Sequence, residues 1–364
     1  MRRDSSYPNE SSTFFQRRDR LPLHGLAALR ILIVLMIGLG YASTMGLGTE
    51  SFEWGHHWGY DPSWYGLQLL FLLSGFLAAR SMTQGRTIVE FFKSRLFSLW
   101  PALLTATLVT VLIIYPLMCA PDAPVKMDAL DLTAYFFKTV FLIDPGSRMP
   151  GLLDDAKYMC LMQGAIWTLR WGLILHVAFL FGWMTKLLQN RHLALVSAVL
   201  GLAGYVSTVF LAVKFPAFAQ IIEPVLPGIR LGYIYLCGVA LFSWQHKLPR
   251  RLFTIWIIAA LLGAAATFHY HVLPWTPLIE ILGTAFWATL CIGFLTHAPL
   301  AMRRCPRLAP VLYVTIWPAA QIIVALVPEL NAFGVIEFSV LLASSTAVVG
   351  FLLLRQARIQ PTRL

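Results

Sequence analysis

The sequence predicts an all-α membrane protein with about ten transmembrane helices and with both termini in the cytoplasm. Of its 364 residues, 58% are hydrophobic and only 12% are charged, which is about half the charged fraction of an ordinary soluble domain. The mean hydropathy is +0.70. Apolar stretches long enough to cross a bilayer as helices recur along the whole chain, and most of the basic residues fall between them. These observations indicate that most of the chain lies in lipid.

The chain divides into two short tails and one membrane domain. Residues 1–22 are expected to form a cytoplasmic tail, because the long apolar run that follows them differs from a cleavable signal peptide. Residues 23–354 form the membrane domain, and residues 355–364 a second cytoplasmic tail. The run 132–144 is too short to span and is expected to form an amphipathic helix in a long loop. The predicted spans are 23–46, 64–82, 96–117, 163–186, 193–213, 228–245, 252–272, 276–296, 308–328 and 333–354.

The positions of the charges test this number of spans and give its orientation. With the first tail inside, 20 of the 28 Lys and Arg residues fall in the tails and loops predicted on the cytoplasmic side or at the span ends next to them, as the positive-inside rule requires. The long loop between the third and fourth spans is instead rich in aspartate. Miscounting by one helix would destroy this alternation from the error onward. Ten spans with both ends inside therefore fit the charges.

The same features exclude several other classes of protein. The net charge of +11 is explained by topology, since the basic residues do not gather on one face as they would for nucleic acid. The five cysteines are scattered without metal-ligand spacing, so we expect neither a disulfide framework nor a metal site. No phosphate-binding glycine motif and no internal repeat is present.

Charged groups inside predicted spans are the first candidate site residues, because a charge in lipid is costly and is kept for a purpose. Arg30 lies about two turns inside the first span, and its counter-charge must come from another helix, a ligand phosphate or water. Tyr41 follows eleven residues later near the same helix face, roughly 16 Å along the axis. The two residues form either a polar track through the bundle or a structural pair.

Two further segments combine polar and apolar residues. In the fourth span, Trp167 and Trp171 bracket Arg170, which is either an interfacial anchor or part of a site; His176 follows one turn beyond Gly172. At the start of the third span, the basic residues Arg86, Lys93 and Arg95 either set topology or bind a negatively charged cytoplasmic cofactor.

Five segments, in the right order over about 300 residues, together resemble the acyltransferase-3 family of integral membrane acyltransferases. The resemblance covers nearly the whole chain and implies a ten-helix fold that transfers acyl groups from acyl-CoA to carbohydrates. The segments are LAALRILIVLMIGLGYA (26–42), FLLSGFLAARS (71–81), FFKSRLFSLWPAL (91–103), MPGLLDDAKYMCLMQGAIWTLRW (149–171) and YVTIWPAAQ (313–321).

The sequence departs from the family pattern where the chemistry is expected. The family's first-helix histidine aligns with Tyr41, a carboxylate with Gly172 and an arginine with Ser98. A phenol titrates near 10 and is a poor base at neutral pH. His176, on nearly the same helix face as Gly172 and one turn deeper, is a candidate for the missing proton acceptor.

The resemblance implies an O-acetyltransferase of a bacterial inner membrane that acts on an exopolysaccharide, with cellulose as one candidate acceptor. Arg30, Tyr41 and His176 would be catalytic. Arg86, Lys93 and Arg95 would bind the phosphates of acyl-CoA, most plausibly acetyl-CoA, with no metal, and Trp167, Arg170 and Trp171 would frame the acceptor side. Two alternatives stay open: a catalytically degraded accessory subunit of a polysaccharide synthesis or export complex, favoured by the departures, and a transporter, disfavoured because matching broken helices are missing.

Overall fold

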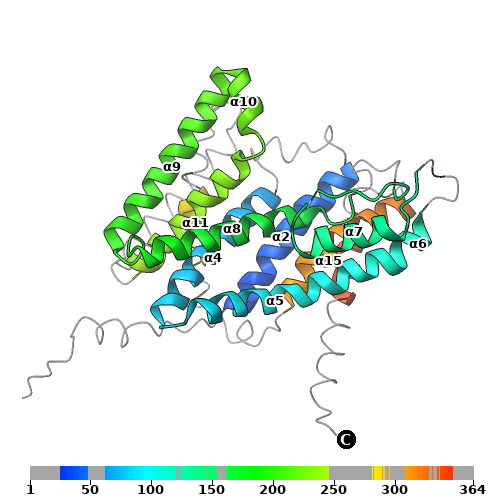
Figure 1. Ribbon diagram of the computed structural model, residues 1–364, viewed down its shortest axis with the longest axis horizontal. Helices are drawn as coiled ribbons and strands as arrows, with labels where there is room; N and C mark the ends of the chain where they lie inside the picture. The colour runs from blue at the N-terminus through cyan, green and yellow to red at the C-terminus, as the bar shows by residue number, and fades with distance from the viewer. Residues whose placement is uncertain are drawn as a thin grey trace, which may run out of the picture.

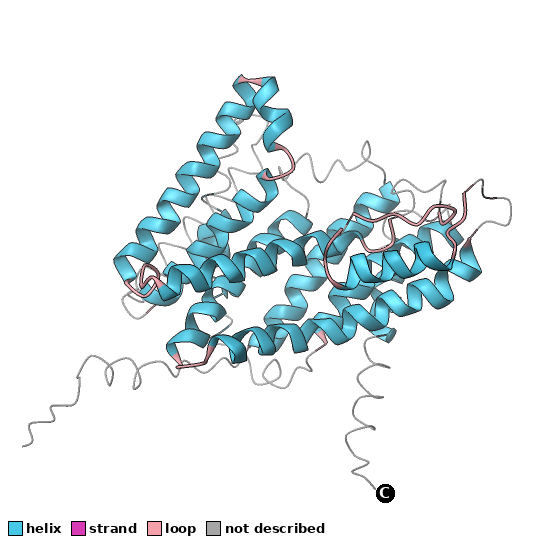
Figure 2. Cartoon of the chain, in the orientation of Figure 1, coloured by secondary structure: helices cyan, strands magenta, loops and turns pink. Residues whose placement is uncertain are grey.

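The computed structural model describes residues 25–47, 62–119, 123, 125–144, 146–153, 161–245, 281, 283–288, 290, 291, 295, 308–327, 330, 334, 335 and 337–346. In these residues the protein is all-helical, with 83% helix and no strand (Figures 1 and 2). The two predicted tails and the span 252–272 lie outside the described residues, and the spans 276–296 and 333–354 lie only partly inside them.

Six of the described helical segments are long and apolar enough to cross a membrane, so the chain is a multi-pass membrane protein. Each corresponds to a predicted span, and the shorter apolar helix Leu26–Ala42 corresponds to the first one. The main helices are α2 (Leu26–Leu47), α4 (Pro62–Thr83), α5 (Ile88–Val109), η1 (Thr110–Ile114), α6 (Tyr115–Met118), α7 (Ala129–Val140), η2 (Gly164–Ile166), α8 (Trp167–Met184), α9 (Arg191–Lys214), α10 (Pro216–Ile222), α11 (Leu226–Trp244) and α15 (Ala309–Leu326).

Helix α5 begins eight residues before the predicted span. Thr87 and Glu90 form a capping box, in which the backbone N–H of Glu90 donates to Thr87 Oγ1 at 3.2 Å and that of Thr87 donates to Glu90 Oε2 at 2.9 Å. This reciprocal pair satisfies two N–H groups that have no helical partner, and it starts the helix at Ile88. Arg95, which the sequence placed just before the span, therefore lies two turns inside the helix.

The amphipathic helix predicted at 132–144 is present as α7, and it runs back along α5. Tyr115 holds its beginning, since the backbone N–H of Met127 donates to the Tyr115 hydroxyl at 2.7 Å. Trp100 holds its end, because its Nε1 donates to the carbonyl of Val140 at 3.2 Å. Fifteen residues separate these two anchors along the continuous helical segment formed by α5, η1 and α6, about 22 Å at helical rise. The loop therefore covers one side of this segment from Trp100 to Tyr115.

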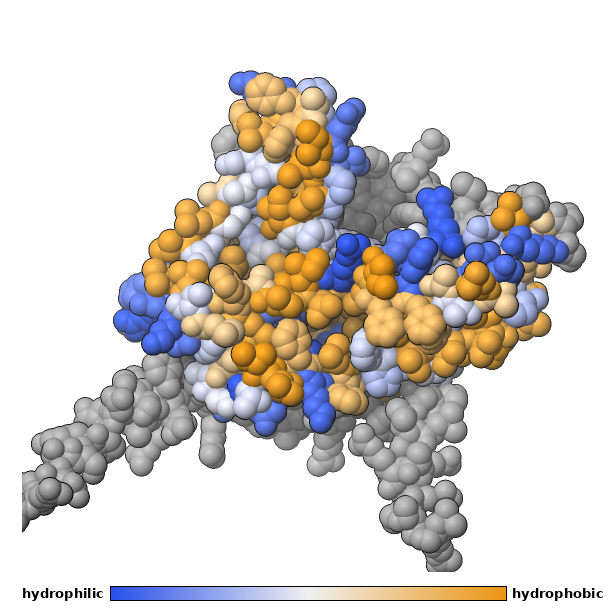
Figure 3. Space-filling model, viewed as in Figure 1, coloured by the Kyte–Doolittle hydropathy of each residue, from blue (hydrophilic) through white to orange (hydrophobic). Residues whose placement is uncertain are grey.

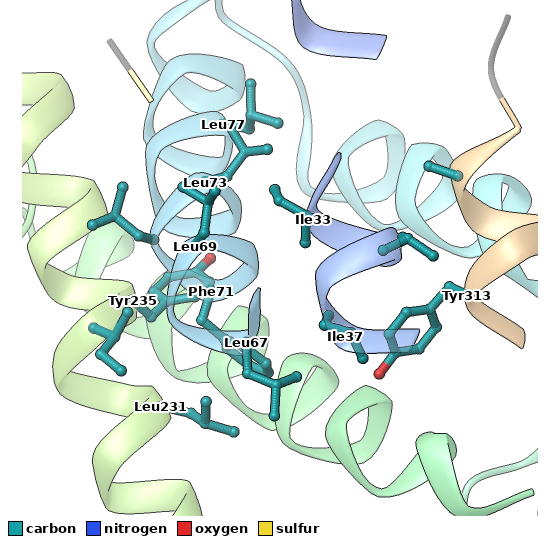
Figure 4. Packing of buried hydrophobic residues seen from close by; sticks show 14 of the residues in the cluster. Ile33, Ile37, Leu67, Leu69, Phe71, Leu73, Leu77, Leu231, Tyr235 and Tyr313 are labelled. Atoms are coloured by element: carbon teal, nitrogen blue, oxygen red, sulfur yellow. The ribbon is translucent and has the colours of Figure 1, made fainter. Parts of the chain in front are cut away.

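Helices α4 and α11 cross with their backbones in contact. A Cβ atom at Gly75 would overlap the carbonyl of Tyr235, and one at Gly238 would overlap the carbonyl of Leu72. The two glycines therefore allow the main chains of α4 and α11 to approach closely. Figure 4 shows Leu69 and Leu73 of α4 in this core, with Tyr235 of α11 beside Leu69 and with α2 on the other side of α4.

Helix α15 holds the entrance of α8 through three polar side chains one turn apart. The hydroxyl of Tyr313 donates to the carbonyl of Ala165 at 3.0 Å. Trp317 Nε1 and Gln321 Nε2 both donate to the carbonyl of Leu161, at 3.0 and 3.1 Å. These bonds satisfy carbonyls of the irregular segment before α8, which could not be left bare in lipid.

The outward faces of the spanning helices are apolar. Helix α9 packs against α11 and is followed by the short helix α10 (Figure 1), and only 11% of its apolar stretch is buried. Figure 3 shows hydrophobic residues spread over α5, α7 and α9 on the face turned to the viewer. A surface of this kind is what lipid contact requires.

Candidate functional site

A cavity of about 270 Å³ lies among α2, α4, α5, α8 and α15. It occupies the half of these helices nearest the turn between α4 and α5, since its lining reaches Leu77 of α4 and Phe92 of α5. Towards the opposite half it ends at the level of Leu70, Leu103 and Tyr313. The predicted orientation puts the α4–α5 turn, and hence this half, on the cytoplasmic side.

Three basic side chains from three different helices line this cavity. They are Arg30 of α2, Arg95 of α5 and His176 of α8. The guanidinium of Arg95 lies 5.3 Å from the ring centroid of Phe91, within the range of a cation–π contact. The imidazole of His176 lies 5.5 Å from the same ring. Arg95 and His176 therefore gather around Phe91 at one end of the cavity.

The hydrogen bond of His176 defines which of its ring nitrogens can take a proton. Nδ1 lies 2.5 Å from the carbonyl oxygen of Gly172. Because a carbonyl only accepts, Nδ1 carries the hydrogen in the neutral ring, and Nε2 carries the lone pair. Nε2 is buried and has no hydrogen-bond partner among the described residues. The ring is thus held in the tautomer that a general base needs.

The opposite end of the cavity is mainly apolar. Leu70, Leu99 and Leu103 line it together with Leu169. Its end wall contains Thr168 and Tyr313, whose hydroxyl groups are hydrogen-bonded to each other. Few polar groups therefore line this end of the cavity.

One side of the cavity is lined by partly exposed apolar side chains. Trp100, Phe141 and Leu173 line the cavity, yet 38%, 53% and 40% of their surfaces are exposed. They come from α5, from the end of α7 and from α8. The cavity therefore approaches the apolar outer surface between α5 and α8, where the end of α7 covers it.

Tyr41 is not brought to this cavity. Its ring packs edge-on against Trp317, with the centroids 4.8 Å apart, one turn of α15 beyond Tyr313. Arg30 lines the cavity and Tyr41 does not. Of the three predicted catalytic residues, the structure joins Arg30 and His176 and places Tyr41 beyond the Thr168–Tyr313 end wall.

The three residues predicted to bind the cofactor also separate. Arg95 lines the cavity, whereas Arg86 and Lys93 are exposed and do not. Both lie near the α4–α5 turn, Arg86 just before α5 and Lys93 in its second turn. They flank the charged end of the cavity from outside.

None of the predicted acceptor residues lines the cavity. Arg170 is exposed, and its Nη1 donates to the carbonyl of Ile143 at 3.3 Å. Trp171 packs on Gly228 of α11, and Trp167 is half-buried against the core. This part of α8 instead contributes Thr168, Leu169 and Gly172 to the cavity.

Gly172 opens space at the position where the resemblance implies a carboxylate. A Cβ atom built there meets no other atom within 4 Å, because the residue lines the cavity. No aspartate or glutamate belongs to the described lining residues. The side chain of Ser98, the second departure, lies outside the described residues.

A buried arginine in the predicted span 228–245 was not among the predicted site residues. Arg230 is only 3% exposed, and its guanidinium lies 3.4 Å from the ring centroid of Trp64. A charged residue in an apolar helix was the signal that could have found it. Tyr313 and Thr168 were also missed, because a hydroxyl in a span gives no comparable signal.

The cavity offers two guanidinium groups to an anionic or carbonyl group, and an imidazole that can take a proton. Both are requirements of acyl transfer. In comparisons with known proteins, no family model, no curated protein and no solved structure matches the chain.

Proposed function

We propose that the protein is a membrane-bound acyltransferase, which moves an acyl group from acyl-CoA to a hydroxyl of an exopolysaccharide at a bacterial inner membrane. The observation that carries this proposal is the convergence of Arg30, Arg95 and His176 on one cavity. These residues lie far apart in the sequence, and each is costly in lipid. The resemblance to the acyltransferase-3 family supplies the substrate classes, with cellulose as one candidate acceptor.

The proposed reaction uses the cavity as follows. The oxygen of the acceptor hydroxyl attacks the thioester carbonyl carbon, while His176 Nε2 accepts the proton of that hydroxyl. Arg95 and Arg30 stabilise the negative charge that develops on the carbonyl oxygen. The carbon–sulfur bond then breaks, and the proton passes from Nε2 to the departing CoA sulfur. Arg86 and Lys93, at the mouth, attract the CoA phosphates.

Acyl transfer in membranes tests this proposal. Labelled acyl-CoA is supplied to membranes that contain the wild type, Arg95→Ala or His176→Gln, and label in the polymer fraction is measured. Loss of the base is expected to lower transfer about 100-fold or more. Arg191→Ala is the matched control, because Arg191 is an exposed arginine whose guanidinium lies over Trp244. Equal transfer by all four proteins contradicts the proposal.

A second candidate is a non-enzymatic accessory subunit of a polysaccharide synthesis or export complex. The lack of a carboxylate among the described lining residues favours it, since a histidine base is commonly oriented by one. CoA-dependent turnover, measured in the wild type and in Gly172→Glu, for whose side chain the cavity has room, separates the two candidates. An accessory protein shows no CoA-dependent turnover in the wild type, whereas the enzyme turns over before the change is made.

A further inference from the structure

The distribution of polar and apolar side chains in the cavity bears on the length of the acyl chain that it can bind. Arg95 and His176, which both lie beside Phe91, are in the half towards the α4–α5 turn. From the level of Arg95 to that of Leu103, α5 advances eight residues, about 12 Å. Along this distance the lining is formed mainly by leucines and by Phe141. The space beyond the charged groups is therefore long and apolar.

The few polar groups in this apolar part already have hydrogen-bond partners. Ser74 Oγ donates to the carbonyl of Leu70 at 2.7 Å. Thr168 and Tyr313 bond to each other and to the carbonyl of Ala165. The amide-containing arm of CoA would lose hydrogen bonds to water here and regain few, which is unfavourable. An alkyl chain loses nothing and gains from burial.

We infer that the donor is an acyl-CoA with a medium-length alkyl chain, rather than acetyl-CoA, and that the chain occupies the apolar half of the cavity. This inference rests on the proposed function. The thioester carbonyl lies near Arg95 and His176, CoA extends towards the α4–α5 turn, and the chain points towards Leu103. An acetyl group would leave this space without apolar contacts. The wall of Trp100, Phe141 and Leu173 places the chain beside the lipid.

Two glycines allow a matched test. Gly172 faces the cavity, and Gly204 lies on α9 away from it; a Cβ atom at either meets no atom within 4 Å. Leucine at Gly172 fills part of the apolar half, while leucine at Gly204 adds the same side chain outside the cavity. Both changes remove a helix-interior glycine, so their effects on helix propensity are alike.

Binding of CoA, acetyl-CoA and octanoyl-CoA is measured with protein in lipid nanodiscs, and their consumption is measured in the same preparations. We expect octanoyl-CoA to bind the wild type and Gly204→Leu at least about tenfold more tightly than acetyl-CoA. In Gly172→Leu this difference should disappear. Gly172→Ala, which adds one carbon, should lose a smaller part of it and serves if the leucine variant fails to fold.

Each outcome has a distinct meaning. Equal binding of octanoyl-CoA and acetyl-CoA by the wild type, with turnover, overturns the inference and leaves the proposed function intact. An octanoyl preference that persists in folded Gly172→Leu overturns the placement of the chain. If no CoA compound binds or is consumed, the proposed function fails and the inference fails with it.

Discussion

Thr168 and Tyr313, 145 residues apart in the sequence, are joined by a hydrogen bond between their hydroxyl groups in the protein interior. This bond ties α8 to α15 and forms the end wall of the cavity. Beyond it lies Trp317, against which Tyr41 packs. The wall therefore separates two regions that the sequence suggested were one polar track.

We expect Thr168→Val and Tyr313→Phe to be coupled. Each variant removes one hydroxyl of the pair, so each should lower the free energy of unfolding by about 1 kcal/mol. The double variant should cost less than the sum, since the shared bond is lost only once. Thermal unfolding of purified protein measures this. Thr315→Val is the control, because the Thr315 hydroxyl donates to carbonyls of its own helix, those of Val311 and Leu312.

We expect Gly75→Ala to destabilise the protein strongly, because its Cβ would overlap the carbonyl of Tyr235. Overpacking of this kind costs about 1–3 kcal/mol or more when backbone must move. Gly204→Ala should instead be neutral or stabilising by up to about 1 kcal/mol, since its Cβ meets open space. The yield of monodisperse protein and the unfolding midpoint are the measurements. Equal behaviour of the two variants would contradict the described crossing of α4 and α11.

We expect Arg230→Met to destabilise the protein more than Arg191→Met. Arg230 is buried with its guanidinium over Trp64, whereas Arg191 is exposed and lies 5.5 Å from the centroid of Trp244. A desolvated cation–π contact contributes about 2 kcal/mol or more, and an exposed one about 0.5–1 kcal/mol. Unfolding midpoints give the comparison. Arg230→Lys should not restore stability, because an ammonium cannot stack as a guanidinium does.

We expect Tyr115→Phe to loosen the segment that contains α7. The Tyr115 hydroxyl accepts from the backbone N–H of Met127 and donates to the carbonyl of Pro150 at 3.2 Å. It therefore anchors the chain both before and after α7. Limited proteolysis should cut the variant faster between residues 119 and 160 than the wild type. Tyr235→Phe is the control, because its hydroxyl has no hydrogen-bond partner among the described residues. Equal cleavage in both variants would argue against this anchoring role.

The sequence predicts the spanning helices well, because twenty apolar residues in a row have few other structures available in lipid. It misplaces the start of α5, where the capping box outweighs hydropathy, and it does not predict α10. It predicts that α7 is a helix but not where α7 lies. That position depends on Trp100 and Tyr115, whose partners are distant backbone atoms.

Individual site residues are predictable, but their assembly is not. Arg30 and His176 are conspicuous in the sequence because each puts a polar group in a span. They line the same cavity as Arg95 because α2, α5 and α8 are neighbours. Hydropathy does not predict which helices pack against one another. Tyr41 shows the limit, since sharing a helix face with Arg30 did not bring it to the same cavity.

The backbone contact at Gly75 and Gly238 has a consequence for motion. Two helices whose main chains are in contact cannot slide or tilt without breaking that contact. We therefore expect α4 and α11 to move as a rigid pair. The end of α7 is held instead by a side chain, through the hydrogen bond from Trp100 Nε1 to the carbonyl of Val140. A movement that admits or releases a substrate is therefore expected at α5, α7 and α8 rather than at the contact between α4 and α11.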